Sequence, residues 1–469
     1  MLSALKVLFI NILLALTTLI PQETLSIGII GQPTSFLPSQ ATSDSERLIS
    51  QIVFRSLFKF QDGELVNDLV DKWSTSEDIK TYKIVLKENI FWQDGTPITS
   101  NDILYSLSLR ENLINEMEIE KISSKEVQIK LSTATAMLPS ILTFGIEPSH
   151  LRNQNKISPV GSTSYRILKI EKERSEIKSI TLQSFEKNKQ YNRIIVRFYN
   201  TDNDLVTAYK LGEIKTFLSQ TDINLPNVTK TNLTFLGRYF LLVINTQKPA
   251  LQPIENREIL VKSLDLNSYL LGHYYETSLK AQGPISHSEF TKEEGFEYTY
   301  DSKATLSISQ KNTMSKLSIL LPNNTDGRQM ESVLKEFWGK QLGIDLQFEF
   351  LNIDEITKRG SGGEFDILLI GHEITPDPDR YIFWHSTQIG KLNMAQFEDL
   401  RADKALEEGR RATSAEDRLK HYSIFQDVIS TKIPAIFLYH PGSYFYVSEK
   451  TPVPLPNVIY YPSDILNNL

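Results

Sequence analysis

Apolar side chains recur at every second position in several parts of the chain. The pattern is clear over residues 82–86 and again over residues 127–131. Successive side chains of a strand point to opposite faces, so this period predicts strands with one buried face. A short apolar run over residues 25–30 predicts a further strand.

A strand–helix–strand unit is predicted between residues 317 and 350. Residues 317–321 are an apolar run, and residues 344–350 alternate between apolar and charged or polar. Between them, a helical face is predicted from the spacing of Met330, Val333, Leu334, Phe337 and Leu342. Gly343 favours the end of that helix. Because such crossovers join parallel strands, we expect a parallel sheet here, with another buried strand at residues 365–370.

Two helix starts are marked by polar residues three positions apart. In the segment 92–107, Thr99 and Asp102 fit a capping box that follows an Asp-Gly turn. Near the end of the chain, Thr413 and Glu416 predict a second capped helix. Strands and helices therefore alternate along the chain, which is typical of the α/β class.

The N-terminal segment points to export from the cytoplasm. Residues 7–20 are almost entirely apolar, with Lys6 before them and Pro21 after them. This run is shorter than the roughly 20 residues of a spanning helix, and it resembles a secretory signal. No Ala-x-Ala-like cleavage site follows, so an uncleaved membrane anchor is the alternative, and a buried core helix is a third. Either a secretory signal or a membrane anchor would place the protein in the periplasm or at the outer face of the cytoplasmic membrane.

Composition excludes several partners and chemistries. The chain has 469 residues, 40% of them hydrophobic and 10% aromatic, which is ample for buried cores. Its 50 Lys and Arg against 57 Asp and Glu give a net charge of −7, so we expect no nucleic-acid partner. There is no cysteine, which excludes disulfides, thiolate nucleophiles and Cys-ligated metals.

Motifs for catalysis are missing from the sequence. The dipeptide His372-Glu373 begins like a zinc-protease motif, but Pro376 stands where the second His is required. No Gly-x-Ser-x-Gly elbow occurs, and the glycine-rich residues 359–363 lack the Gly-Lys-Ser/Thr of a phosphate loop. We therefore expect a protein that is not an enzyme and that needs no cofactor or metal.

The segment 92–107 resembles the signature of the family 5 extracellular solute-binding proteins, the oligopeptide-, dipeptide- and nickel-type receptors of bacterial ABC importers. From residue 92 to residue 99, the residue types are in turn aromatic, any residue, Asp, Gly, any residue, Pro, hydrophobic and Thr. Further segments fall in the order of the family, at residues 53–60, 69–73, 243–246, 256–260, 343–346, 364–367, 377–379 and 433–436. The resemblance covers nearly the whole chain after residue 25.

This resemblance implies an α/β, two-lobed periplasmic-binding-protein-like fold of type II, in the large peptide-binding subclass, with an extra subdomain inserted in the first lobe. Mapped onto this chain, the signal or anchor is residues 1–23, the first lobe is residues 24–43, 161–236 and 444–469, the inserted subdomain is residues 44–160, and the second lobe is residues 237–443. The signature segment would then lie in the subdomain, with a structural role.

The function implied is that of an extracytoplasmic receptor, a monomer that captures an oligopeptide and delivers it to the permease subunits of an ABC importer. A nickel complex, a glycan or another solute is the alternative cargo. A surface adhesion or signalling module that kept the fold is a second alternative. An enzyme of peptide or cell-envelope chemistry is a third, disfavoured by the missing motifs.

The resemblance also indicates where the ligand binds. Relatives commonly place an Asp, which holds the ligand amine, shortly before a Pro in the segment after a buried strand. Here Ile374 stands at that position before Pro376, and we expect Glu373 to substitute. Ligands gather beyond the carboxyl ends of strands in open α/β sheets. The candidate ligand-binding residues are His372, Glu373 and Asp379, with the aromatic Phe36, Tyr239 and Trp384; the alternative for all six is packing or solvation.

Overall fold

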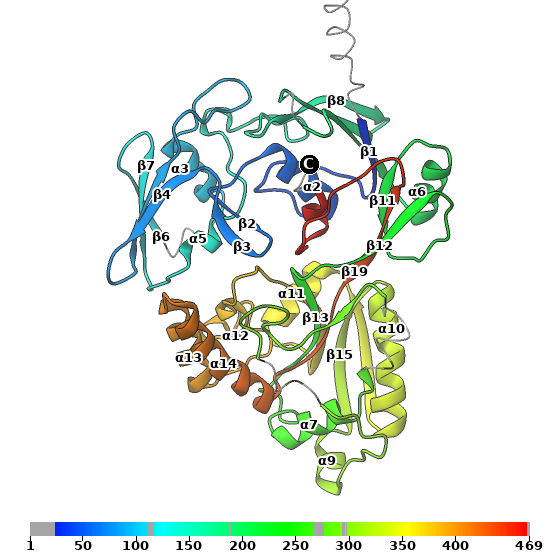
Figure 1. Cartoon of the computed structure of the whole chain (residues 1–469). Coiled ribbons are helices and arrows are strands. Elements are labelled where there is room, and N and C mark those ends of the chain that lie inside the picture. Colours follow the sequence, from blue (N-terminus) through cyan, green and yellow to red (C-terminus); the bar gives the residue numbers. More distant parts are fainter. Residues whose placement is uncertain are drawn as a thin grey trace, which may run out of the picture.

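The computed structural model describes residues 24–110, 117–186, 189–266, 268, 276–292, 296 and 298–466. The predicted signal or anchor at residues 1–23 lies outside these ranges. Within them, no helix combines the length and the apolar character that crossing a bilayer requires. The described strands form four sheets, and the two large ones lie in separate halves of the molecule (Figure 1).

The first large sheet has seven strands in the order β12-β19-β11-β1-β10-β9-β8. Their bounds are β1 (Thr24–Ile30), β8 (Tyr165–Glu173), β9 (Glu176–Ser184), β10 (Arg193–Tyr199), β11 (Thr216–Ser219), β12 (Val228–Thr234) and β19 (Gly442–Ser448), and the helices of this half are α2 (Asp44–Val53), α6 (Asp202–Lys210) and the short η4 (Pro462–Leu466). The predicted strand at residues 25–30 is thus a central strand, parallel to β10 and β11.

A four-stranded sheet and a hairpin lie beside the first sheet (Figure 1). They contain β2 (Phe58–Gln61), β3 (Glu64–Asn67), β4 (Val70–Thr75), β5 (Thr81–Leu86), β6 (Met117–Lys121) and β7 (Glu126–Leu131), with the helices α3 (Ser100–Ser108), α5 (Leu138–Ile141) and η1 (Ser149–Leu151). The alternating segments at residues 82–86 and 127–131 are the paired strands β5 and β7, as predicted. The backbone N–H of Thr99 donates to Asp102 at 2.8 Å, which confirms the capping box before α3.

The second large sheet has six strands in the order β14-β18-β13-β17-β15-β16. Its strands are β13 (Arg238–Ile244), β14 (Leu279–Lys280), β15 (Lys316–Pro322), β16 (Asp345–Leu351), β17 (Ile367–Glu373) and β18 (Ala435–His440). The helices of this half are α7 (Ile254–Lys262), α9 (Ile308–Thr313), α10 (Thr325–Leu334), η2 (Lys335–Gln341), α11 (Ile353–Ser361), α12 (Tyr381–Trp384), η3 (Ser386–Gln388), α13 (Leu400–Arg411) and α14 (Ala415–Lys432). β15 pairs in parallel with both β16 and β17, so the predicted parallel unit is confirmed.

One sequence prediction needs correction. The helix α14 is capped by Ser414, whose hydroxyl accepts the backbone N–H of Asp417 at 3.1 Å, and not by Thr413. The same Ser/Thr-plus-acid pattern occurs one residue later, and the chain uses that register. The helix α2 packs against β8 and η4. The domain boundaries, that at residue 44 included, stay predictions.

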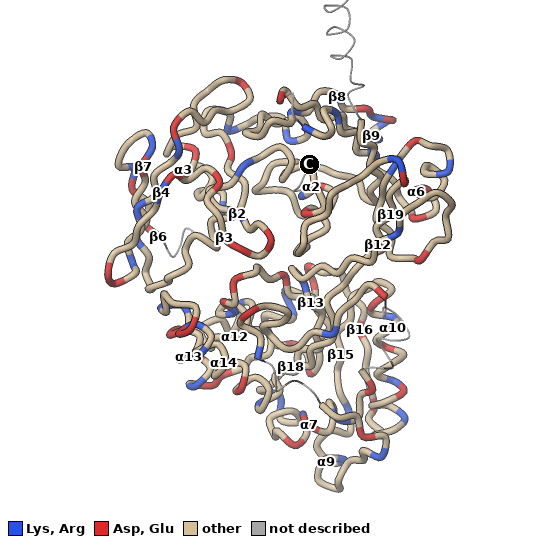
Figure 2. Tube along the Cα trace, viewed as in Figure 1, with Lys and Arg blue, Asp and Glu red and all other residues tan. Residues whose placement is uncertain are grey.

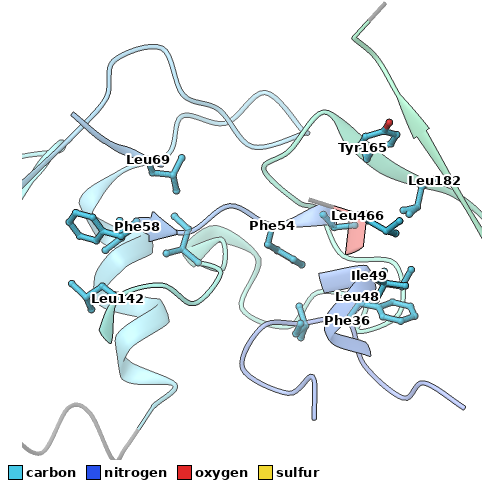
Figure 3. Packing of buried hydrophobic residues seen from close by; sticks show 14 of the residues in the cluster. Phe36, Leu48, Ile49, Phe54, Phe58, Leu69, Leu142, Tyr165, Leu182 and Leu466 are labelled. Atoms are coloured by element: carbon cyan, nitrogen blue, oxygen red, sulfur yellow. The ribbon is translucent and has the colours of Figure 1, made fainter. Parts of the chain in front are cut away.

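One continuous apolar core joins the seven-stranded sheet to the four-stranded sheet. Figure 3 shows how α2 contributes Leu48 and Ile49 beside Leu182 of β9, while Phe58 and Leu142 extend the cluster toward the hairpin. The second half has its own clusters on the two faces of the six-stranded sheet. The chain crosses between the halves twice, from β12 to β13 and from β18 to β19. Acidic and basic residues are interspersed along both halves (Figure 2).

Candidate functional site

Glu373, the last residue of β17, lies between two arginines from different elements. Arg47 of α2 donates to both of its carboxylate oxygens, with Nη1–Oε1 at 2.9 Å and Nη2–Oε2 at 3.2 Å. Arg238, which opposes Glu373 in the β13–β17 register, donates to Oε1 as well. We call these residues the ion triad. It joins α2 to the six-stranded sheet.

The ion triad is only half-buried and carries an excess positive charge. The side chain of Glu373 is 42% exposed, and those of Arg47 and Arg238 are 28% and 33% exposed. Burial alone would raise the pKa of the Glu373 carboxyl, but the hydrogen bonds and charges of Arg47 and Arg238 outweigh it and lower that pKa. Glu373 is therefore ionised at neutral pH, and two guanidinium groups share one carboxylate.

The segment after β17 is held by the C-terminal part of the chain. Tyr461 donates its hydroxyl to the carbonyl of Ile374 at 2.6 Å, and the N–H of Ile374 donates to the carbonyl of Gly237 at 2.8 Å. Gly237 in turn donates to the carbonyl of Tyr460 at 2.8 Å. A Cβ atom on Gly237 would lie 2.6 Å from that carbonyl oxygen, so the close approach requires glycine. The C-terminal segment, red in Figure 1, thus contacts both halves.

A cavity of about 920 Å³ lies near the ion triad, although none of the three residues of the triad belongs to its lining. Its lining comes from residues within 50–56, 59–63, 89–95, 143–145, 162–165, 185–194 and 456–466, together with Pro376 from the other half. Arg47 lies one helical turn before Ser50 of the lining, and Tyr461 belongs to the lining itself. The volume is in the range of ligand pockets, which run from about 300 to 1,000 Å³. The signature segment, predicted to be structural, also borders this cavity.

A second contact between the halves uses the main chain alone. The N–H of Ala136 donates to the carbonyl of Arg410, at the end of α13, at 2.7 Å. Tyr82 of β5 fixes that loop, because its hydroxyl donates to the carbonyls of Thr135 and Ala136 at 2.7 and 2.8 Å. The four-stranded sheet is therefore tied to the second half through the loop that Tyr82 holds.

Of the six predicted site residues, Glu373 is the one that the structure places in an exposed charged cluster. His372 is buried and stacks on Phe383 with ring centroids 4.1 Å apart. Burial, with a smaller contribution from the charge of Arg380, lowers the pKa of His372 to about 3, so this imidazole is neutral. It packs against Tyr239 in the core of the second half.

The aromatic candidates Phe36, Tyr239 and Trp384 are fully buried. Phe36 packs beside Leu48 and Ile49 under α2 (Figure 3), while Tyr239 and Trp384 belong to one core cluster of the second half. These contacts favour the packing alternative for the three rings. Their role in ligand binding stays a prediction without a contact to support it.

Asp379 and its neighbour Asp377 hold a turn after β17. Asp379 accepts from Nε of Arg410 at 2.6 Å, and Asp377 accepts from Nη2 of Arg418 at 2.9 and 3.0 Å. Arg380 donates from its guanidinium to the carbonyls of Thr375, Asp377 and Asp379 and of Pro284. The turn alternative therefore accounts for both carboxylates, and it fixes the segment that follows Glu373.

Arg47, Arg238 and Tyr461 are the site residues that sequence reasoning missed. Arg47 lies 326 positions and Arg238 lies 135 positions from Glu373, so no local pattern joins them. Among the described residues, no group of three or more His, Asp or Glu is arranged to hold a metal ion.

Comparison with known proteins gives one consistent result. The sequence pattern of a family described as "Bacterial extracellular solute-binding proteins, family 5 Middle" matches residues 64–391. The oligopeptide-binding protein AppA of Bacillus subtilis (strain 168) is 24% identical over 96% of this chain and 91% of its own length. The dipeptide-binding protein of Escherichia coli (strain K12) is 20% identical over 87% of this chain and 88% of its own.

Solved structures agree on the fold. NikZ from Campylobacter jejuni, in complex with Ni(L-His), superposes with a TM-score of 0.74, 18% identity, and coverage of 96% of this chain and 99% of that one. AppA from Bacillus subtilis, in complex with a nonapeptide, gives a TM-score of 0.74 at 19% identity, with coverage of 95% and 97%. The predicted two-lobed α/β fold of the binding-protein class is therefore confirmed.

Proposed function

The chain belongs to the bacterial extracellular solute-binding proteins of family 5, and from this premise we propose that it captures an oligopeptide outside the cytoplasm and delivers it to an ABC importer. The observation that carries the proposal is the ion triad near the cavity. A free peptide has an ammonium group at one end and a carboxylate at the other. The ion triad offers Glu373 to the ammonium group, and Arg47, once it leaves Glu373, is a donor for a carboxylate group of the peptide.

In the proposed binding step, the ammonium group of the ligand replaces Arg47 as a partner of Glu373. An incoming ammonium group takes a place on the Glu373 carboxylate that Arg47 occupies, while Arg238 stays beside Glu373 in the neighbouring strand. The released Arg47 then presents a planar, two-pronged donor, which suits a carboxylate. Charge pairs are exchanged rather than lost, which keeps the desolvation cost of binding small.

The relatives support a peptide as cargo. Several curated relatives are named as oligopeptide- or dipeptide-binding proteins, and AppA is seen with a nonapeptide. We propose that the second half closes on the peptide from the side of Pro376, and that binding occurs without turnover. Capture by a monomer and delivery to permease subunits are part of the same proposal.

The test is calorimetry with a free peptide and with the same peptide acetylated at its amine. If Glu373 holds the amine, Glu373→Gln should weaken binding of the free peptide by about 1.5–3 kcal/mol, the range for a hydrogen bond to a charged group. Acetylation should then cost the wild type much and the variant little. Glu336→Gln is the matched control, because Glu336 is 59% exposed and pairs with Lys340 on η2.

Equal losses on acetylation in the wild type and in Glu373→Gln would show that Glu373 does not hold the amine. Ligand that copurifies with the protein, identified by mass spectrometry, decides the cargo independently. A nickel complex or a glycan in place of a peptide would overturn the peptide assignment and leave the receptor function standing. A product that accumulates beyond one equivalent per protein would overturn binding without turnover.

A further inference from the structure

Two large apolar side chains are exposed on the wall of the cavity. Phe91 is 50% exposed and Phe185 is 60% exposed, and both belong to the lining. Single exposed apolar residues are common on protein surfaces and indicate nothing. Two phenylalanines on the wall of one cavity are a different observation, because ligand pockets are lined mainly by apolar and aromatic side chains with a few polar groups.

Both phenylalanines are carried by backbone that is firmly held. Phe91 forms an isolated β-bridge with Pro97, and the next residue, Trp92, is buried and donates its backbone N–H to the carbonyl of Thr96 at 2.8 Å. Phe185 directly follows β9, and its N–H donates to the carbonyl of Ser164 at 3.2 Å. A ligand that contacts these rings would therefore not have to order the loops that carry them.

Gln93, two residues after Phe91, binds the segment 161–165, to which the N–H of Phe185 also donates. Its side-chain oxygen accepts the N–H of Gly161 at 3.0 Å, and its side-chain nitrogen donates to the carbonyls of Thr163 and Tyr165 at 3.1 and 2.7 Å. Its backbone N–H donates to the carbonyl of Gly161 at 2.9 Å. The signature segment thus fixes the cavity wall in addition to capping α3.

The surrounding lining contains further aromatic side chains and also the charged groups of Arg55, Lys59, Asp62, Asp68, Glu186, Lys189 and Asp464. Tyr165, Tyr460 and Tyr461 are further members of it. Of its basic groups, Arg55 is already paired with Asp68, at 2.7 Å from Nη2 to Oδ1. Aromatic rings gain from contact with other rings beyond the area they bury. Phe91 and Phe185 therefore offer an aromatic side chain two exposed rings to contact.

We propose that Phe91 and Phe185 form an apolar subsite that takes an aromatic side chain of the bound peptide. The inference rests on the proposed function and makes it more specific. The ion triad would hold the ammonium end of the peptide, and the subsite would select for one of its side chains.

The test compares peptides of one length and identical termini, in which Phe replaces Ala at one position at a time. We expect the best Phe-containing peptide to bind the wild type about tenfold more tightly than the all-Ala peptide. Phe91→Ala and Phe185→Ala should each remove most of that preference, leave the affinity for the all-Ala peptide unchanged, and leave circular dichroism unchanged. Phe91→Leu should restore part of the preference.

Leu168→Ala is the control, because Leu168 lies on β8, is 51% exposed and is outside the described lining. It should keep the full preference. Equal affinity of the wild type for the Phe and Ala peptides would overturn the subsite, and so would variants that lose both peptides equally. Both of those results leave peptide binding intact. Failure of every peptide to raise the melting temperature would instead refute the proposed function, and the subsite with it.

Discussion

The pair Asp377–Arg418 is buried, and a single substitution there should strongly destabilise the second half. The side chains are 4% and 7% exposed, and two hydrogen bonds of 2.9 and 3.0 Å join them. Asp377→Asn keeps the shape of the side chain and removes its charge. Arg418 would then be a buried guanidinium without its counter-charge, beside the rings of Phe290 and Tyr422.

The cost follows from this burial. Breaking a buried ion pair by removing one partner typically costs about 3–5 kcal/mol, because the remaining charge is desolvated and uncompensated. Both side chains of the exposed Glu336–Lys340 pair are more than half exposed, and such surface pairs contribute about 0–1 kcal/mol. Removing both buried charges, in Asp377→Asn with Arg418→Met, should cost less than the sum of the single substitutions.

Urea unfolding of the four members of this cycle, followed by tryptophan fluorescence, measures these free energies. Glu336→Gln serves as the control. A loss of under about 1 kcal/mol for Asp377→Asn would refute the reasoning that the pair is desolvated. Single-variant losses that simply add up in the double variant would show that the two residues stabilise the fold independently.

Further predictions concern Glu46, Arg47 and the N-terminal segment. Burial would raise the pKa of Glu46, but hydrogen bonds from the backbone of Ser43, Thr34 and Thr42 lower it from 4.5 to about 2. The stabilisation that the Glu46 carboxylate provides is therefore present above pH 4.5 and is lost as the pH falls to about 2. Over this pH range, the midpoint of unfolding should fall less for Glu46→Gln than for the wild type. Arg47→Ala should cost no more than about 1 kcal/mol in unfolding free energy, because the ion triad is partly exposed, and a larger loss in urea titrations would contradict that view. If residues 1–23 are an anchor, cell fractionation should find the full chain with the membrane and a chain starting at Thr24 in the soluble fraction; equal solubility, with a mature N-terminus near Gln22, would favour a cleaved signal.

Local patterns predicted the elements well, because their causes are local. The period of two at residues 82–86 and 127–131 and the strand–helix–strand unit at residues 317–350 appear as β5, β7, and β15 to β16. The capping box at Thr99 followed from residues three positions apart. The cap of α14 was missed by one residue, since Thr413 and Ser414 offer equivalent hydroxyls and the packing of the helix decides between them.

Within the ion triad, only the residue at the end of a predicted strand could be predicted from the sequence. Glu373 was found because it ends a buried strand, and the ends of such strands gather ligands. Its partners Arg47 and Arg238 come from a distant helix and a neighbouring strand, and only the sheet order brings them together. The aromatic candidates Phe36 and Trp384 could not be judged from sequence, because a ring packs equally well in a core or against a ligand.

Two of the contacts between the halves, the ion triad and the bond from Ala136 to Arg410, differ in their response to ionic strength. The ion triad is partly exposed, and salt screens such pairs over about 8 Å at physiological concentration. The bond from Ala136 to the carbonyl of Arg410 carries no formal charge, so salt leaves it nearly unchanged. In the ligand-free protein, we expect added salt to speed the separation of the two halves up to a limit. Beyond that limit, the uncharged contacts set the rate of opening, among them this main-chain bond and the bonds from Tyr461 to Ile374 and from Gly237 to Tyr460.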